Sequence, residues 1–281
     1  MKIAFVTDSS AGITQVVAQE MNITVIRMPL LIDGQDFLEE VEITREALID
    51  AMLNGKSVGT SQPNLQYTLE KIESLLETHD HVMYLPISKE LSGTYENMVF
   101  YEKEFEGKLT VVDTKSVSWL LRIMVSQGQE LAEKGYTPAD IKRILEDDSF
   151  LYAILIPEDL QYLKRGGRIK PAAAAVANLL RIVPILSVTD TGIDLYDKVR
   201  THRKALLKGF EKITEYQPYD DYEWAVLDGG TSPELVDAFV ADLENVTGCE
   251  VHKGKMYPIV LSHTGPGTIA FAAIKKIKEL R

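Results

Sequence analysis

Four segments in the first half of the chain place Ser and Thr side chains in a turn between an apolar strand-like run and a helix-like run. In an open parallel sheet such turns all lie at the carboxyl ends of the strands, where ligands bind. Helix N-termini there offer free N–H groups and a partial positive charge. These donors would suit a carboxylate or a phosphate, although each Ser or Thr could instead be a helix cap. The segments are VTDSS (6–10), VGTSQP (58–63), LPISKELSGTY (85–95) and VVDTKSVS (111–118).

A fifth hydroxyl-bearing turn, in the segment VLSHTGPGTIA (260–270), adds a histidine, a proline and two glycines. The sequence predicts a buried strand over 258–262 before this turn and a closing helix over 269–277 after it. The glycines let the backbone approach a ligand closely, and Pro266 stiffens the turn. His263 would then precede a helix N-terminus, which disfavours a protonated imidazole. This histidine either contacts a ligand or only ties the turn to neighbouring backbone.

The same side chains are also compatible with an enzyme. Ser92, His263 and Asp8 could in principle form a hydrolase triad, because triads are defined by geometry and not by order in the chain. The chain has no G-x-S-x-G elbow, which argues against an α/β-hydrolase. The segment GPGTIA (265–270) matches the dinucleotide fingerprint, but too few residues follow it for the returning strand. A small-molecule hydrolase or phosphoryl-handling enzyme therefore stays the alternative to a binding protein.

The amino-acid composition limits the kinds of ligand and partner that the protein can bind. The 281 residues are 45% hydrophobic and 26% charged, and their net charge of −12 disfavours general attraction to nucleic acid or anionic membranes. Cys249 is the only cysteine, so no intrachain disulfide or cysteine-based metal cluster can form. The N-terminus turns polar too early for a signal peptide, and the longest apolar region, 171–188, is interrupted by polar residues and a proline. We expect a soluble cytoplasmic protein with no metal, cofactor, nucleic-acid partner or stable membrane insertion.

Strand-like and helix-like runs alternate in the first half of the chain. This alternation is typical of a parallel α/β sheet with helices on both faces. The sequence therefore predicts a Rossmann-like α/β domain over 1–150. Its expected strands are 2–7, 22–33, 81–87 and 109–113, and its expected helices are 12–21, 44–54, 63–78, 94–104, 116–134 and 138–147.

The second half mixes hairpins with helices. Two expected strands are joined by Asp190-Thr191-Gly192, which is a hairpin signal. We therefore predict an α+β domain with a mixed sheet over 151–281. The expected elements are strands 150–157, 183–189, 193–200, 223–228 and 250–257, an alanine-rich helix over 172–180, and helices 203–215 and 233–246.

Six short motifs, in the same order along nearly the whole chain, resemble the DegV family, the FakB-type fatty-acid-binding proteins of bacteria. They are TDSS (7–10), TSQP (60–63), LSGTY (91–95), YLKRGGRI (162–169), VRTHRKAL (199–206) and HTGPGT (263–268). The resemblance implies a two-domain carrier that encloses one long-chain fatty acid between its domains, with the carboxyl at the hydroxyl turns and the acyl chain in an apolar tunnel. It further implies a separate ATP-dependent fatty-acid kinase as partner, which makes acyl phosphate for phospholipid synthesis.

Carried over by motif, the resemblance assigns ligand-binding residues and no catalytic ones. Hydroxyl and backbone donors can hold a carboxylate without burying a full opposite charge beside it. We expect His263 to contact the carboxyl in concert with Ser92 and Thr60. The expected ligand-binding residues are Thr60, Ser61, Ser92, Gly93, Thr94, Arg168, Arg200, His263, Thr264 and Gly265.

Two departures from the family pattern leave the head-group charge and the acyl-chain preference open: Val183 stands where family members often have Lys, and the bulky Trp119 follows the fourth turn. The chain also has one concentration of basic side chains, which is either a solvated face or a docking surface for an acidic partner or a phosphate. Its members are Lys164, Arg165, Arg168, Lys170, Arg181, Arg200, Arg203 and Lys204.

Overall fold

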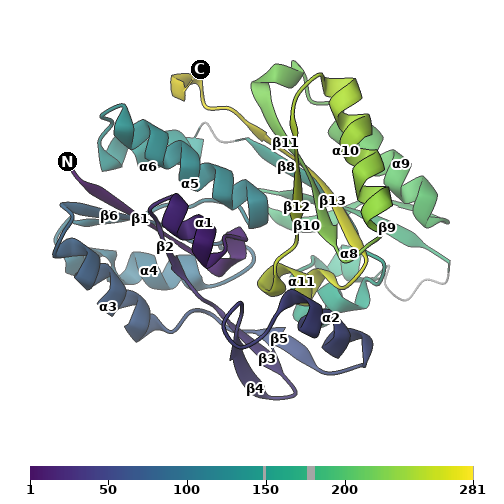
Figure 1. The fold of residues 1–281 in the computed structure, drawn as a ribbon, viewed down its shortest axis with the longest axis horizontal. Helices are drawn as coiled ribbons and strands as arrows, with labels where there is room; N and C mark the ends of the chain where they lie inside the picture. The colour runs from purple at the N-terminus through teal and green to yellow at the C-terminus, as the bar shows by residue number, and fades with distance from the viewer. Residues whose placement is uncertain (148–149, 176–180, 281) are drawn as a thin grey trace.

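Figure 1 shows the computed structural model, which describes residues 1–147, 150–175 and 181–280. A four-stranded parallel sheet and a six-stranded mixed sheet lie beside each other, with a small three-stranded antiparallel sheet below them in this view. The parallel sheet is built from strands before residue 112, and the mixed sheet from strands that begin at Leu151. The predicted fold class, a parallel α/β sheet followed by a mixed sheet, is therefore confirmed. The division into domains 1–150 and 151–281 stays a prediction.

The parallel sheet has the strand order β2-β1-β6-β7. In β1, Ala4 and Val6 pack with Ile72 and Met98 of helices α3 and α4, whereas Phe5 faces the cluster that contains helix α5. Because both faces are covered, the strands are apolar almost throughout. The bounds are β1 (Ile3–Asp8), β2 (Thr24–Ile26), β6 (His81–Leu85), β7 (Leu109–Val111), α1 (Gln15–Glu20), α3 (Leu65–Leu76), α4 (Thr94–Glu102), α5 (Ser118–Glu133) and α6 (Pro138–Asp147).

The mixed sheet has the order β10-β9-β8-β13-β11-β12. In β8, Ile154 packs in the cluster that includes α9 and α10, and its neighbour Leu155 packs in the cluster that includes α5. Helix α5 contacts both β1 and β13, so it joins the two sheets. The bounds are β8 (Leu151–Ile156), β9 (Val183–Thr189), β10 (Gly192–Val199), β11 (Tyr222–Gly229), β12 (Val251–Lys255), β13 (Thr268–Lys275), α9 (His202–Ile213) and α10 (Pro233–Thr247).

The expected strand 22–33 is divided between two sheets. Its first part, β2, pairs in parallel with β1, whereas β3 (Pro29–Ile32) is the central strand of the small antiparallel sheet, in the order β4-β3-β5. Pro29 opens β3, a position where its missing N–H is tolerated. The other bounds here are β4 (Gln35–Leu38), α2 (Arg45–Leu53) and β5 (Val58–Thr60).

The structure reverses the two elements predicted around the closing turn. The expected strand 258–262 is helix α11 (Pro258–Thr264), and the expected helix 269–277 is strand β13. Pro258 is the first residue of α11, a position that suits its fixed φ and missing N–H. Strand β13 is central in the mixed sheet and buried almost throughout. Such a short, continuous apolar run has no period that separates a strand from a helix, and its alanines favour a helix locally.

Predictions of where a helix starts or a hairpin turns agree better with the structure than the predicted type of the elements around the closing turn. The Thr137 hydroxyl accepts a hydrogen bond from the Asp140 N–H at 3.2 Å, at the start of α6, and the β9–β10 hairpin turns at Asp190-Thr191-Gly192 as predicted. Of the expected alanine-rich helix 172–180, the structure shows α8 (Pro171–Ala174), and 176–180 lie outside the described residues. The remaining elements are α7 (Gln161–Gly166) and the short 3-10 turns Ser9–Ala11, Lys103–Phe105, Tyr219–Asp221 and Lys278–Leu280.

Candidate ligand-binding site

A narrow cavity lies where helix α11, helix α7, strand β5 and the turn before α4 meet. Its volume is about 60 Å³, well below the 300–1,000 Å³ or so of a typical small-molecule pocket, so a larger ligand requires the lining side chains to move apart. Residues from both halves of the chain contribute to it. They are Met28, Thr60, Ser61, Ile87, Leu91, Ser92, Val117, Leu163, Arg168, Ile193, Ile259, Val260, His263 and Thr264.

His263 lies in the last turn of α11, and not before a helix N-terminus as predicted. Its Nε2 is 2.8 Å from the Thr60 hydroxyl at the end of β5. The other ring nitrogen faces Gly166, where a Cβ would stand only 2.2 Å from Nδ1. The imidazole is therefore held between a hydroxyl and a bare stretch of backbone, and a side chain at 166 would displace it.

His263 has its pKa lowered to about 4, first by burial and second by the positive charge of Arg168. The sequence argument expected a neutral imidazole for a different reason, the N-terminus of a following helix. At the C-terminus of α11 the helix dipole favours a protonated ring, so burial and Arg168 outweigh it. His263 is neutral at pH 7 and offers one donor and one acceptor to the cavity.

Arg168 is the only cationic side chain in the described lining, which contains no Asp or Glu. Its Nε donates to the Leu91 carbonyl at 3.1 Å, and its Nη1 donates to the Gly166 carbonyl at 2.6 Å. Within the described part of the chain, Arg168 forms no ion pair. Two carbonyl oxygens thus orient a half-buried guanidinium without neutralising it, which leaves its charge for an anionic ligand.

The turn before α4 supplies the hydroxyl of Ser92, which is buried and lies 2.9 Å from the hydroxyl of Thr94. Neither residue caps the helix, because the N-cap of α4 is Gly93 and no side chain caps it. Gly93 allows the Gln62 side chain to approach, since a Cβ there would stand 2.7 Å from its Nε2. Gly93 and Thr94 therefore shape the turn from outside the cavity lining, whereas Ser92 is part of it.

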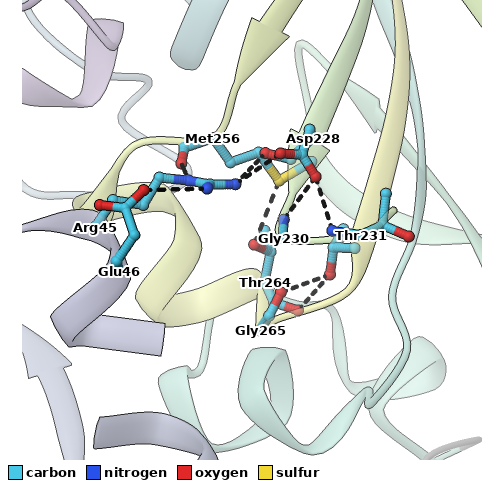
Figure 2. A network of polar contacts seen from close by, with 9 residues as sticks. Arg45, Glu46, Asp228, Gly230, Thr231, Met256, Thr264 and Gly265 are labelled. Carbon is cyan, nitrogen blue, oxygen red and sulfur yellow. Dashed lines mark hydrogen bonds and ion pairs between the residues drawn. The ribbon is translucent and has the colours of Figure 1, made fainter. Parts of the chain in front are cut away.

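Helix α11 is fixed in position by contacts across the molecule (Figure 2). Arg45 of α2 donates from Nε to the Met256 carbonyl at 3.0 Å and from Nη2 to the Asp228 carboxylate at 3.0 Å. The Thr264 hydroxyl contacts the Met256 sulfur at 3.6 Å, close to the cavity. Gly265 has a φ of +85°, and a Cβ there would stand 2.4 Å from the Tyr162 ring. Arg45 therefore ties the first half of the chain to the loop that precedes α11.

The structure brings six of the ten expected residues into the cavity lining: Thr60, Ser61, Ser92, Arg168, His263 and Thr264. Gly93 and Gly265 lie next to lining residues in the chain, and Thr94 lies two residues after Ser92. Arg200 does not belong to the lining, because it is exposed at the bend between β10 and α9. Most of the wider basic cluster around Arg168 is likewise exposed.

The hydroxyl side chains of two of the four turns, 6–10 and 111–118, lie outside the cavity lining, although Val117 of the second turn belongs to it. Asp8 accepts hydrogen bonds from the Ser10 hydroxyl at 2.5 Å and from the Ile87 N–H at 2.8 Å. Thr114 donates to the Pro86 carbonyl at 2.7 Å. These bonds fix the loop after β6, which carries Ile87 into the lining.

The triad considered from the sequence is not assembled among the described residues. Ser92 pairs with Thr94, His263 pairs with Thr60, and the Asp8 carboxylate is occupied by Ser10 and Ile87. In the same part of the chain, no cluster of His, Cys, Asp and Glu has the geometry of a metal site, and no helix has the length and apolar character to cross a bilayer.

The apolar part of the lining was not identified from the sequence. Its members come from segments far apart in the chain, and nothing in the local pattern separates them from ordinary core residues. Ile87, Leu91 and Val117 do lie within the hydroxyl-bearing segments, which was the one available signal. The apolar residues are Met28, Ile87, Leu91, Val117, Leu163, Ile193, Ile259 and Val260.

The architecture is that of an α/β protein with a parallel sheet, a mixed sheet and a cavity whose polar and apolar lining comes from both halves of the chain. The chain belongs to the DegV family: a family model described as "Uncharacterised protein, DegV family" matches residues 2–276. A DegV domain-containing protein of Streptococcus pneumoniae is 31% identical over 283 residues, covering 99% of this chain and 100% of that protein.

Solved structures share the fold over nearly the full length. One described as showing fatty-acid binding of a DegV family protein from Thermus thermophilus has a TM-score of 0.82 and 29% identity, and the match covers 98% of this chain and 100% of that one. Another, described as a fatty acid binding DegV family protein from Streptococcus agalactiae, has a TM-score of 0.84 and 26% identity over 98% and 99% of the two chains.

Proposed function

We propose that the protein binds one long-chain fatty acid in this cavity. The observation that carries the proposal is the composition of the lining: one cation, a neutral histidine and several hydroxyls lie among side chains that are otherwise apolar. A fatty acid has the same two-part chemistry. The neighbours from Thermus thermophilus and Streptococcus agalactiae, both described as fatty-acid-binding, support this ligand class.

In this proposal the carboxylate lies among Thr60, Ser92 and His263, with Arg168 as its counter-charge. Thr60 and His263 already form one polar unit at 2.8 Å, and the neutral imidazole can donate to a carboxylate. Ser61 and Thr264 complete the polar end, while Gly93, Thr94 and Gly265 hold its backbone. The acyl chain extends along Leu91, Leu163, Ile193 and the other apolar lining residues, which must part to admit it, and the two halves 1–150 and 151–281 enclose it.

Denaturing mass spectrometry of the purified protein tests this proposal. We expect a long-chain fatty acid to co-purify, and delipidated protein to take up added palmitate at one molecule per chain. Arg168→Ala should weaken binding about 10- to 150-fold, because it removes hydrogen bonds to a charged group. Arg165→Ala is the matched control, since Arg165 is exposed and stacks on Tyr162 outside the lining. A protein that is isolated empty and takes up no palmitate would refute the proposal.

We further propose that the loaded protein acts in the cytoplasm and presents the carboxyl group to a separate fatty-acid kinase, without being a catalyst itself. This step follows from the family resemblance and from the exposed basic residues near the site. Arg200 is exposed and outside the lining, so Arg200→Ala should retain palmitate affinity and reduce acyl-phosphate formation in a reconstituted kinase assay. Lys108→Ala, at an exposed position just before β7, is the control. Equal turnover by wild type, Arg200→Ala and Lys108→Ala would show that Arg200 is not part of the surface that binds the kinase.

A further inference from the structure

A second cavity, of about 180 Å³, lies between the first turn of α5 and strand β12. It shares no lining residue with the candidate fatty-acid site. Ser118, Trp119 and Arg122 of α5 line one side, and His252, Lys253 and Lys255 of β12 line the other. Its volume is several times the ~30 Å³ that a water molecule occupies, so a small polyatomic ligand fits.

The charge of this α5–β12 pocket contrasts with that of the whole protein. The pocket lining contains Arg122, His252, Lys253 and Lys255 and no Asp or Glu, although the net charge of the chain is −12. Lys253 is paired with Asp237. Arg122 forms no ion pair or side-chain hydrogen bond with the described residues, so its half-buried guanidinium has no direct counter-ion, although Glu223 and Glu250 line the adjoining pocket that it also borders.

Ser118 adds a hydroxyl donor without a partner, on a residue that is itself largely buried. Its side chain lines the pocket and the residue is only 7% exposed, yet its hydroxyl forms no hydrogen bond within the described structure. Ser118 also has a φ of +60°, which is strained for a residue other than glycine. It begins the 16-residue helix α5, whose N-terminus has no side-chain cap and therefore favours an anion.

The pocket walls are fixed by close packing. The Trp119 and His252 rings are stacked at 5.7 Å with an interplanar angle of 12°. A Cβ at Gly254 would stand 2.9 Å from His252 Nε2, and one at Gly12 would stand 2.8 Å from the Tyr257 ring. Two glycines thus allow two rings to pack tightly against the backbone, and the donors are held in place before any ligand arrives.

We propose that the α5–β12 pocket binds a phosphate group, with the Arg122 guanidinium, the Ser118 hydroxyl and the His252 ring as donors. Arg122 provides the planar fork that suits phosphate oxygens, and Lys255 adds charge at the rim. Burial and the nearby Arg122 lower the pKa of His252, while Glu250 acts in the opposite direction, and a bound phosphate would relieve the effect of Arg122. The proposal is independent of fatty-acid binding, because the two cavities have separate linings.

Titration calorimetry with inorganic phosphate, in low-salt buffer at pH 7, tests the proposal. Arg122→Gln should weaken phosphate binding about 10- to 100-fold, whereas Arg143→Gln, an exposed arginine on α6 outside the pocket, should leave it unchanged. The His252 ring resonance should move on phosphate addition, with its pKa raised. If Arg122→Gln does not fold, Lys255→Gln at an exposed position replaces it, with a smaller expected loss.

Two further arms complete the test. If glycerol phosphate binds more tightly than inorganic phosphate, the natural ligand of the α5–β12 pocket is an organic phosphate. If the two bind with equal affinity, the natural ligand is free phosphate. Palmitate binding should be the same in wild type and Arg122→Gln, which separates this site from the fatty-acid site. Absence of phosphate binding to the wild type, or equal binding by Arg122→Gln, would overturn the proposal.

Discussion

His263 and Glu39 are expected to make opposite contributions to the pH dependence of stability, and two substitutions can separate them. Both residues are attached to α11: His263 lies in its last turn, and the Glu39 carboxylate accepts the Ile259 N–H at 3.3 Å near its start. Glu39 is fully buried and lies 3.5 Å from Arg27, yet burial outweighs the ion pair and raises its pKa from 4.5 to about 7. Burial and Arg168 lower the pKa of His263 from 6.5 to about 4.

The direction in which each residue changes the stability with pH follows from the protonation state that the folded protein prefers. Folding favours neutral His263, so its stabilising contribution is complete above pH 6.5 and is lost as the pH falls toward 4. Folding favours protonated Glu39, so its contribution is complete below pH 4.5 and is lost as the pH rises toward 7. At about 1.4 kcal/mol per pKa unit, each shift corresponds to about 3 kcal/mol, and in the wild type the two changes largely cancel.

Urea unfolding of wild type, His263→Gln and Glu39→Gln between pH 4 and pH 8 measures these contributions. We expect His263→Gln to gain stability relative to wild type as the pH is lowered, and Glu39→Gln to gain as it is raised, each by about 3 kcal/mol across the range. Differences from wild type remove the contributions of other titrating groups. The carbon resonance of the His263 ring gives its pKa directly. Free-energy curves that stay parallel to the wild type, or a His263 pKa near 6.5, would refute the reasoning.

The remaining predictions concern single contacts at the cavity. Ser92→Ala should weaken palmitate binding about 10- to 150-fold with little change in melting temperature, because Ser92 does not cap α4; a stability loss with unchanged affinity would contradict this. Gly166→Ala should displace the His263 ring and weaken palmitate binding at least about tenfold, since its Cβ would stand 2.2 Å from Nδ1. Gly59→Ala, beside Thr60 and with open space around it, is the control, and equal affinities would show that the ring can move without loss.

The chemistry-bearing residues could be predicted from the sequence better than the elements that hold them. His263 reaches the cavity from the C-terminal turn of a helix, although a strand and a following helix were expected around it. The motif fixes which atoms are present and how closely the backbone can approach, whereas the secondary structure of a short apolar segment depends on its neighbours in space. Strand β13 pairs with β8 and β11 on its two sides, and this pairing overrides the helix propensity of its alanines.

The two arginines show a second limit of sequence reasoning. Arg168 and Arg200 belong to similar basic motifs, yet only Arg168 lines the cavity. Arg168 is directed inward by the Leu91 carbonyl, which lies 77 residues away along the chain. No local pattern encodes such a contact. The same holds for the apolar lining, which is selected by tertiary packing from many equivalent Leu, Ile and Val residues.

Long-range contacts also explain why one short helix can carry so much of the candidate site. Helix α11 has only seven residues, too few to be stable alone. It is held by Glu39 near its start, by Thr60 at His263, and by the Arg45 contacts to the preceding loop. All three partners come from the first sixty residues, whereas α11 belongs to the last thirty. The contact between His263 and Thr60 in the cavity lining therefore exists only when the two ends of the chain have packed together, which couples the integrity of the site to the packing of the whole fold.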